Sequence, residues 1–145
     1  MAQALPGCGD DTTDMGTPVG DGGCEVIVEG DLDCTPAFDP PDFTAIYDNV
    51  LKTSCGNPGT DMSCHGPDGA QAGLVLWEPE VAYAHLLEPG DSFPRVVPGK
   101  PECSGLMWRL QSEDPRVRMP LNGAPLSDPV ICAVRLWIAE GADGP

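Results

Sequence analysis

Seven cysteines in 145 residues constrain this chain more than any other feature. The number is too high for an ordinary reduced cytosolic domain, so we expect the sulfurs in disulfides, in bonds to a cofactor or on a metal. The chain needs such cross-links or a cofactor to form a stable core, because it contains 18 glycines and 17 prolines but only 6% aromatic residues. Segments of this composition have little apolar surface to bury. The length fits one domain with a small core.

The chain is strongly acidic, with 23 Asp+Glu against 7 Lys+Arg and a formal net charge of −16. Nucleic-acid binding needs clustered basic residues, so we exclude it. No apolar run approaches the roughly 18 residues of a membrane span. Residues 1–6 lack the basic and apolar regions of a signal peptide.

Residues 1–41 are predicted to be an irregular acidic tail. Residues 9–41 contain nine carboxylates and no Lys or Arg, with one short apolar run at Val26-Ile27-Val28. Leu5-Pro6-Gly7-Cys8 resembles the end of a bacterial lipoprotein signal. Lipid on Cys8 would make the tail a flexible tether to a membrane, and an exposed tail cysteine is the alternative.

Residues 42–145 are predicted to form an all-α domain. Phe43, Ile46, Tyr47 and Val50 fall on one helical face behind the N-cap residue Asp42. Three further helices are predicted: Glu80 to Glu88 after Pro79, one starting at Pro101, and one running from Ser127 to Gly141.

Cys55 and the pair Cys64-His65 are the most informative residues. A thiol directly before a histidine suits covalent haem attachment, because the sulfur bonds the porphyrin edge while the imidazole reaches the iron. Eight residues separate the two cysteines, Gly56 to Ser63, where two are usual. By spacing alone, a Cys55–Cys64 disulfide is favoured, and zinc is a weaker rival.

A series of short motifs follows in order through about 100 residues. They are Ile46-Tyr47-Asp48-Asn49-Val50-Leu51, Ser54-Cys55, Cys64-His65-Gly66, Gly73-Leu74, Ala82-Tyr83, Arg95-Val96-Val97-Pro98-Gly99-Lys100-Pro101, Ser104-Gly105-Leu106, Arg118-Met119-Pro120-Leu121, Leu126-Ser127 and Trp137-Ile138-Ala139-Glu140-Gly141-Ala142. In this order the chain resembles a c-type cytochrome domain found in exported proteins of environmental bacteria. The long Cys-x8-Cys-His segment departs from that pattern.

The resemblance implies one haem c, with thioethers to Cys55 and Cys64, His65 as the proximal ligand and Met119 as the distal ligand. His/Met ligation leaves no open position on the iron, which suits one-electron transfer. We therefore expect a periplasmic or extracellular electron carrier, lipid-anchored or part of a larger complex, whose redox partners dock through a basic patch.

Met119 also has support from its surroundings in the sequence. It lies between Arg118 and Pro120 in a stretch without helical period, where a thioether is better explained by something soft to bind. His85 is the competing distal ligand, but its place near an apolar helical stripe favours a structural role.

The remaining cysteines suggest local pairs. Cys24 with Cys34 would close a loop in the tail, and Cys103 with Cys132 would join the last two helices. Free buried thiols at Cys103 and Cys132 are the alternative.

Two other functions stay open. A haem enzyme would need an open distal site with Arg118 or His85 as its acid–base group. A haemless, disulfide-stapled binding module is the third interpretation.

Overall fold

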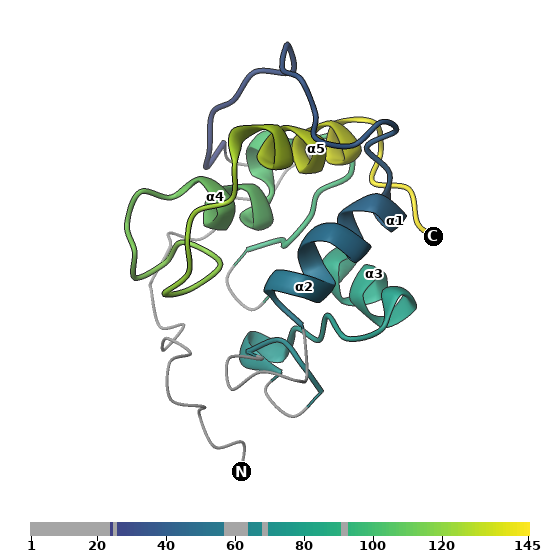
Figure 1. Ribbon diagram of the computed structural model, residues 1–145, viewed down its shortest axis with the longest axis vertical. Helices are drawn as coiled ribbons and strands as arrows, with labels where there is room; N and C mark the ends of the chain where they lie inside the picture. Colours follow the sequence, from purple (N-terminus) through teal and green to yellow (C-terminus); the bar gives the residue numbers. More distant parts are fainter. Residues whose placement is uncertain (1–23, 25, 57–63, 68–69, 91–92) are drawn as a thin grey trace.

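A computed structural model describes residues 24, 26–56, 64–67, 70–90 and 93–145 (Figure 1). The predictions for Cys8 and its lipid lie outside these residues. The described part contains helices and no strands, which confirms the all-α prediction. Within it, no helix is both long enough and apolar enough to cross a bilayer.

The first helical segment consists of α1 (Phe43–Ile46), a π-helical turn η1 (Tyr47–Leu51) and α2 (Lys52–Ser54). The Asp42 side chain caps it by accepting the Ala45 N–H at 2.8 Å, as predicted. The predicted apolar face is buried in the core, with Ile46 and Val50 at most 1% exposed.

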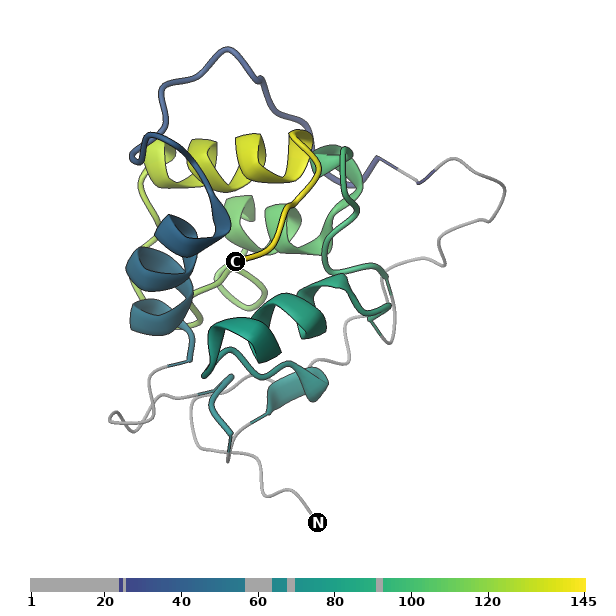
Figure 2. The ribbon, with the colours of Figure 1, turned by 90° about the vertical axis from the view of Figure 1, so that its right-hand side faces the viewer.

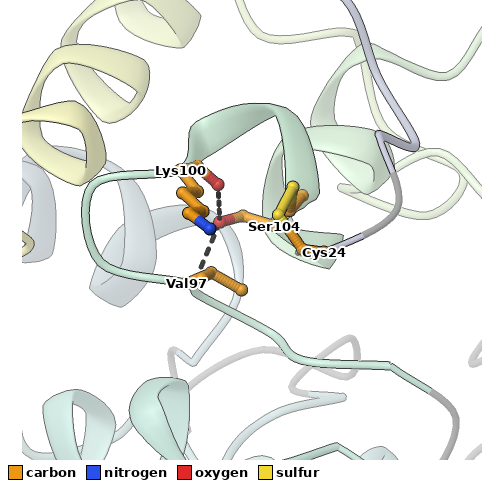
Figure 3. The surroundings of a disulfide bond; sticks show 5 residues. Cys24, Val97, Lys100 and Ser104 are labelled. Atoms are coloured by element: carbon orange, nitrogen blue, oxygen red, sulfur yellow. Dashed lines mark hydrogen bonds between the residues drawn. A yellow bond between two sulfur atoms is a disulfide. The ribbon is translucent and has the colours of Figure 1, made fainter. Parts of the chain in front are cut away.

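Of the next two helices, one begins where the sequence predicts and the other does not. Helix α3 (Pro79–Leu87) begins with Pro in its first turn, as predicted. Pro101 instead opens a short 3₁₀ turn, η3 (Pro101–Cys103), and α4 (Gly105–Gln111) starts after it. The break falls at Ser104, whose hydroxyl accepts the Val97 N–H at 2.9 Å and donates to the Lys100 carbonyl oxygen at 3.0 Å (Figure 3).

The last helix, α5 (Asp128–Ala139), lies near the top of the molecule in Figure 1. Its predicted inner stripe is confirmed by Val134, Trp137 and Ile138, which are buried. The opposite side is covered as well, because Cys132 and Arg135 are only 4% and 5% exposed. Burial lowers the pKa of the Arg135 guanidinium, and nearby Asp31 opposes that shift.

Residues 26–41 form the cover over α5, arching above it in both views (Figures 1 and 2). Gly30 lies directly against the Arg135 guanidinium, where a Cβ would overlap it. The Ala37 N–H donates to the Pro129 carbonyl oxygen at 2.9 Å, and Ile27 and Val28 donate to that of Glu102. Val28 and Phe38 pack against the core.

Two disulfides join this cover to the helices, and they correct the predicted pairs. Cys24 bonds Cys103, and Cys34 bonds Cys132. The Cys24–Cys34 and Cys103–Cys132 pairs are therefore wrong, as is the alternative of free thiols. The flexible tether predicted for the tail is wrong for residues 26–41, because they pack on the helical domain, whereas the domain boundary at residue 42 stays a prediction.

Candidate functional site

Cys55 ends the first helical segment and meets Cys64-His65 directly. The Cys55 N–H still donates to the Leu51 carbonyl oxygen at 3.0 Å, and the Cys55 carbonyl oxygen accepts the His65 N–H at 3.3 Å. Gly56 permits this approach, because a Cβ there would overlap the carbonyl oxygen of Leu76. The structure thus brings the two halves of the Cys-x8-Cys-His segment together.

The His65 ring is oriented by the residues that follow it. Its Nδ1 lies 3.2 Å from the carbonyl oxygen of Leu74, and its own carbonyl oxygen accepts the Leu76 N–H at 2.7 Å. A carbonyl can only accept, so Nδ1 carries the proton and the lone pair of the neutral ring is on Nε2. This is the tautomer in which a metal-binding histidine is held by a backbone carbonyl. His65 is 9% exposed.

Between His65 and Leu74 the backbone adopts left-handed conformations that L-residues rarely take. Ala70 and Ala72 have φ values of 35° and 55°. Each such residue costs on the order of 1–2 kcal/mol. The Arg95 guanidinium holds the loop in place by donating to the carbonyl oxygens of Ala72 at 2.6 Å and His85 at 2.8 Å. The strain therefore lies beside the candidate ligand His65, which is where strained backbone is often retained for function.

His85 has a structural role in this arrangement. Its Nδ1 accepts the Val75 N–H at 3.0 Å, so a neutral ring carries its proton on Nε2. A protonated Nε2 has no lone pair for a metal. This supports the preference for Met119 over His85 as the distal ligand.

Met119 lies in the segment between α4 and α5, partly buried against the same core that Cys55 contacts. Its N–H donates to the Arg109 carbonyl oxygen at 2.8 Å, which fixes the backbone at this position. The Arg118 Nε beside it is buried and has no hydrogen-bond partner within the described structure. An unpaired buried donor of this kind suits an anionic group.

The two candidate haem cysteines are in different states. Cys55 is a free thiol, and burial raises its pKa to about 12, so it is protonated at neutral pH. The Cys55–Cys64 disulfide favoured by spacing is therefore wrong. Cys64 is nonetheless disulfide-bonded. A thioether at Cys64 requires that its sulfur first be reduced.

One further group of possible metal ligands lies outside the candidate haem residues. Among described residues the one cluster of three potential ligands is Cys24, Glu102 and Cys103. Its two sulfurs are already joined to each other. The weaker zinc alternative thus gains no ligand set from the part of the chain that the structure describes.

The supporting residues Leu74 and Arg95 received no role from the sequence. Both lie in motifs that carry the resemblance, Gly73-Leu74 and the stretch beginning at Arg95. Every residue has a backbone carbonyl, so the sequence cannot identify the one that accepts from His65. Only the structure shows that Leu74 orients His65.

The residue types at these positions are those that a haem c would need. A free thiol at Cys55, an imidazole with its lone pair on Nε2 at His65, and a partly buried thioether at Met119 match the chemistry of haem c attachment and His/Met ligation. The unpaired Arg118 donor would suit a propionate. The disulfide at Cys64 is the one state that has to change.

A family model described as Planctomycete cytochrome C matches residues 62–122. The match includes Cys64, His65 and Met119, whereas Cys55 precedes it. It supports a cytochrome c-like domain and suggests haem-based electron transfer in general, which fits a carrier rather than an enzyme. No curated protein and no solved structure matches the chain.

Proposed function

We propose that this protein is a one-electron carrier with one haem c, bonded to Cys55 and Cys64 and ligated by His65 and Met119. The observation that carries the proposal is the position of His65. The backbone N–H of His65 donates to the Cys55 carbonyl oxygen, and the ring Nδ1 faces the Leu74 carbonyl oxygen. The lone pair of the neutral ring is therefore on Nε2.

The haem, when bound, supplies an iron that changes its charge by one electron. His65 and Met119 would hold it with donors of different hardness, and the neutral thioether of Met119 would favour the ferrous state and raise the reduction potential. Leu74 keeps the imidazole proton away from Nε2. If His65 and Met119 both held the iron, no position on it would remain for a substrate, as a carrier requires.

The location of the protein is inferred from its disulfides, and the kind of partner from its net negative charge. We place the protein in the periplasm or outside the cell, where its disulfides persist. Lipid on Cys8 would anchor it, and it would act alone or within a larger complex. Its acidity favours redox partners with a basic patch.

The proposal is tested by expressing the full chain with an export signal and haem-maturation genes. We expect a denatured mass one haem above that of the polypeptide, once lipid and disulfides are accounted for, and low-spin absorption bands. High-spin bands would indicate an enzyme with an open distal site. An unbound or absent haem would contradict covalent attachment.

A further inference from the structure

A groove of about 490 Å³ lies beside the first helical segment, and none of the described cysteines lines it. It is lined by Thr44, Tyr47, Asp48, Lys52, Trp77, Glu78, Pro79 and Pro145. The Trp77 side chain is its large apolar element and is 37% exposed, whereas most large apolar side chains of the described structure are buried. An exposed indole in a groove is a common anchor for a binding partner.

The floor of this groove is formed by packed and hydrogen-bonded residues. Tyr47 is only 5% exposed, and its hydroxyl donates to the carbonyl oxygen of Trp77. Phe43 stacks on Tyr47 with ring centroids 6.0 Å apart. The backbone that carries the indole is thus held by a buried side chain, and little order has to be gained when something binds.

The groove is also negatively charged. Asp48 and Glu78 line it, with Lys52 as its basic residue. Burial raises the pKa of the Tyr47 hydroxyl, and Asp48, Glu78 and Glu80 raise it further. Three carboxylates therefore act on the same floor residue. A cation next to an indole face gains from the ring's π electrons as well as from nearby carboxylates.

Trp77 is connected to the candidate haem ligand through one residue. The N–H of Leu76 donates to the His65 carbonyl oxygen at 2.7 Å, and Trp77 follows Leu76 in the chain. The groove therefore lies at the outer end of a short covalent and hydrogen-bonded path from His65.

We propose that this groove docks a basic segment of the redox partner, with a Lys or Arg side chain on the Trp77 indole beside Asp48 and Glu78. The identity of the partner as a redox protein rests on the proposed function. Binding of a cationic segment does not, because none of the groove residues is a candidate haem ligand. The two parts can therefore fail separately.

The first experiment titrates the haem-free full chain with a pentalysine peptide and follows backbone amide shifts by NMR. We expect the largest shifts at the groove residues. Trp77→Leu should weaken binding at least about threefold, the loss of a cation–π contact. Asp48→Asn with Glu78→Gln should weaken it similarly.

The matched control is Glu113→Gln with Glu140→Gln, which removes the same charge from exposed positions that do not line the groove. If this control weakens binding as much as the groove variants, the peptide responds only to the net charge of the protein. That result, or an unchanged affinity in Trp77→Leu, would mean that the groove is not a docking site.

The second experiment uses the haem-loaded full chain in its ferric state and measures its one-electron reduction by hexaammineruthenium(II), a cationic donor. We expect Trp77→Leu to slow the reaction, with the Glu113→Gln, Glu140→Gln control unaffected. An unchanged rate would overturn the redox role of the groove while leaving peptide binding intact. Failure to load haem would overturn the proposed function and the redox role, whereas the peptide titration would still decide cation docking.

Discussion

The imidazole of His65 is oriented by the carbonyl oxygen of Leu74, which lies nine residues further along the chain and 3.2 Å from its Nδ1. The two residues belong to one loop, which returns to Cys55 through the close contact of Gly56 with Leu76. Geometry at the candidate ligand therefore depends on a glycine nine residues before it.

Gly56→Ala tests that dependence. The added Cβ would overlap the Leu76 carbonyl oxygen, so the loop must move away from Cys55. We expect the free energy of unfolding to fall by about 1–3 kcal/mol, as for other overpacked sites, and haem incorporation to fall with it. Denaturant titration and haem yield measure these effects. Exposed Ser54→Ala is the control, and equal behaviour of the two variants would count against the contact.

Met119→Ala should open the distal site and lower the reduction potential, because the thioether stabilises ferrous iron. The ferric charge-transfer absorbance of sulfur ligation should disappear. His85→Ala should keep that absorbance, while losing on the order of 1 kcal/mol of stability through the unpaired Val75 N–H. If the absorbance survives Met119→Ala, another methionine is the ligand.

Proteolysis of the unreduced protein should release peptides linked through Cys24–Cys103 and Cys34–Cys132. The bonds close loops of 79 and 98 residues in sequence separation. In the chain-entropy model each stabilises by about 4–5 kcal/mol, so the Cys34→Ala, Cys132→Ala variant should unfold at lower denaturant concentration. A fragment linking Cys24 to Cys34 would contradict the structure.

The haem-free protein should lose stability in alkali through Cys55. Its thiol has a folded pKa of about 12 against an ordinary value of 9.0. Above pH 9 the unfolded chain releases this proton first, so the free energy of unfolding falls by up to about 1.4 kcal/mol per pH unit until pH 12. Subtracting the pH profile of Cys55→Ala isolates the effect. In the haem-loaded protein a thioether at Cys55 cannot titrate, so the difference between the two profiles should vanish.

Arg118→Met should affect the two forms of the protein in opposite directions. The change removes a buried N–H without a partner, so the haem-free chain should gain about 1 kcal/mol. If Arg118 pairs with a propionate, the haem-loaded chain should lose stability instead and change the pH dependence of its potential. Equal shifts in both forms would exclude that pairing.

The helices could be predicted where their signals are local. Asp42 caps the first segment through its own side chain, and Pro79 starts α3 in a first turn that needs no N–H donor. The predicted helix start at Pro101 is wrong for α4, because Ser104 bonds Val97 and Lys100 and so interrupts the helix after Cys103. The candidate ligands His65 and Met119 were named from sequence because residue type alone limits what can bind iron.

Only the tertiary structure decided how the cysteines pair. Cys24 and Cys34 are close in sequence, which favours a local loop, yet residues 26–41 cross α5 and bring Cys34 to Cys132. That course is set by contacts such as Gly30 against Arg135, far apart in the chain. The tautomer of His65 was likewise undetermined, since it depends on the Leu74 carbonyl. Residue types and spacing carry local preferences, whereas pairing and ring orientation depend on which distant backbone atoms meet when the chain folds.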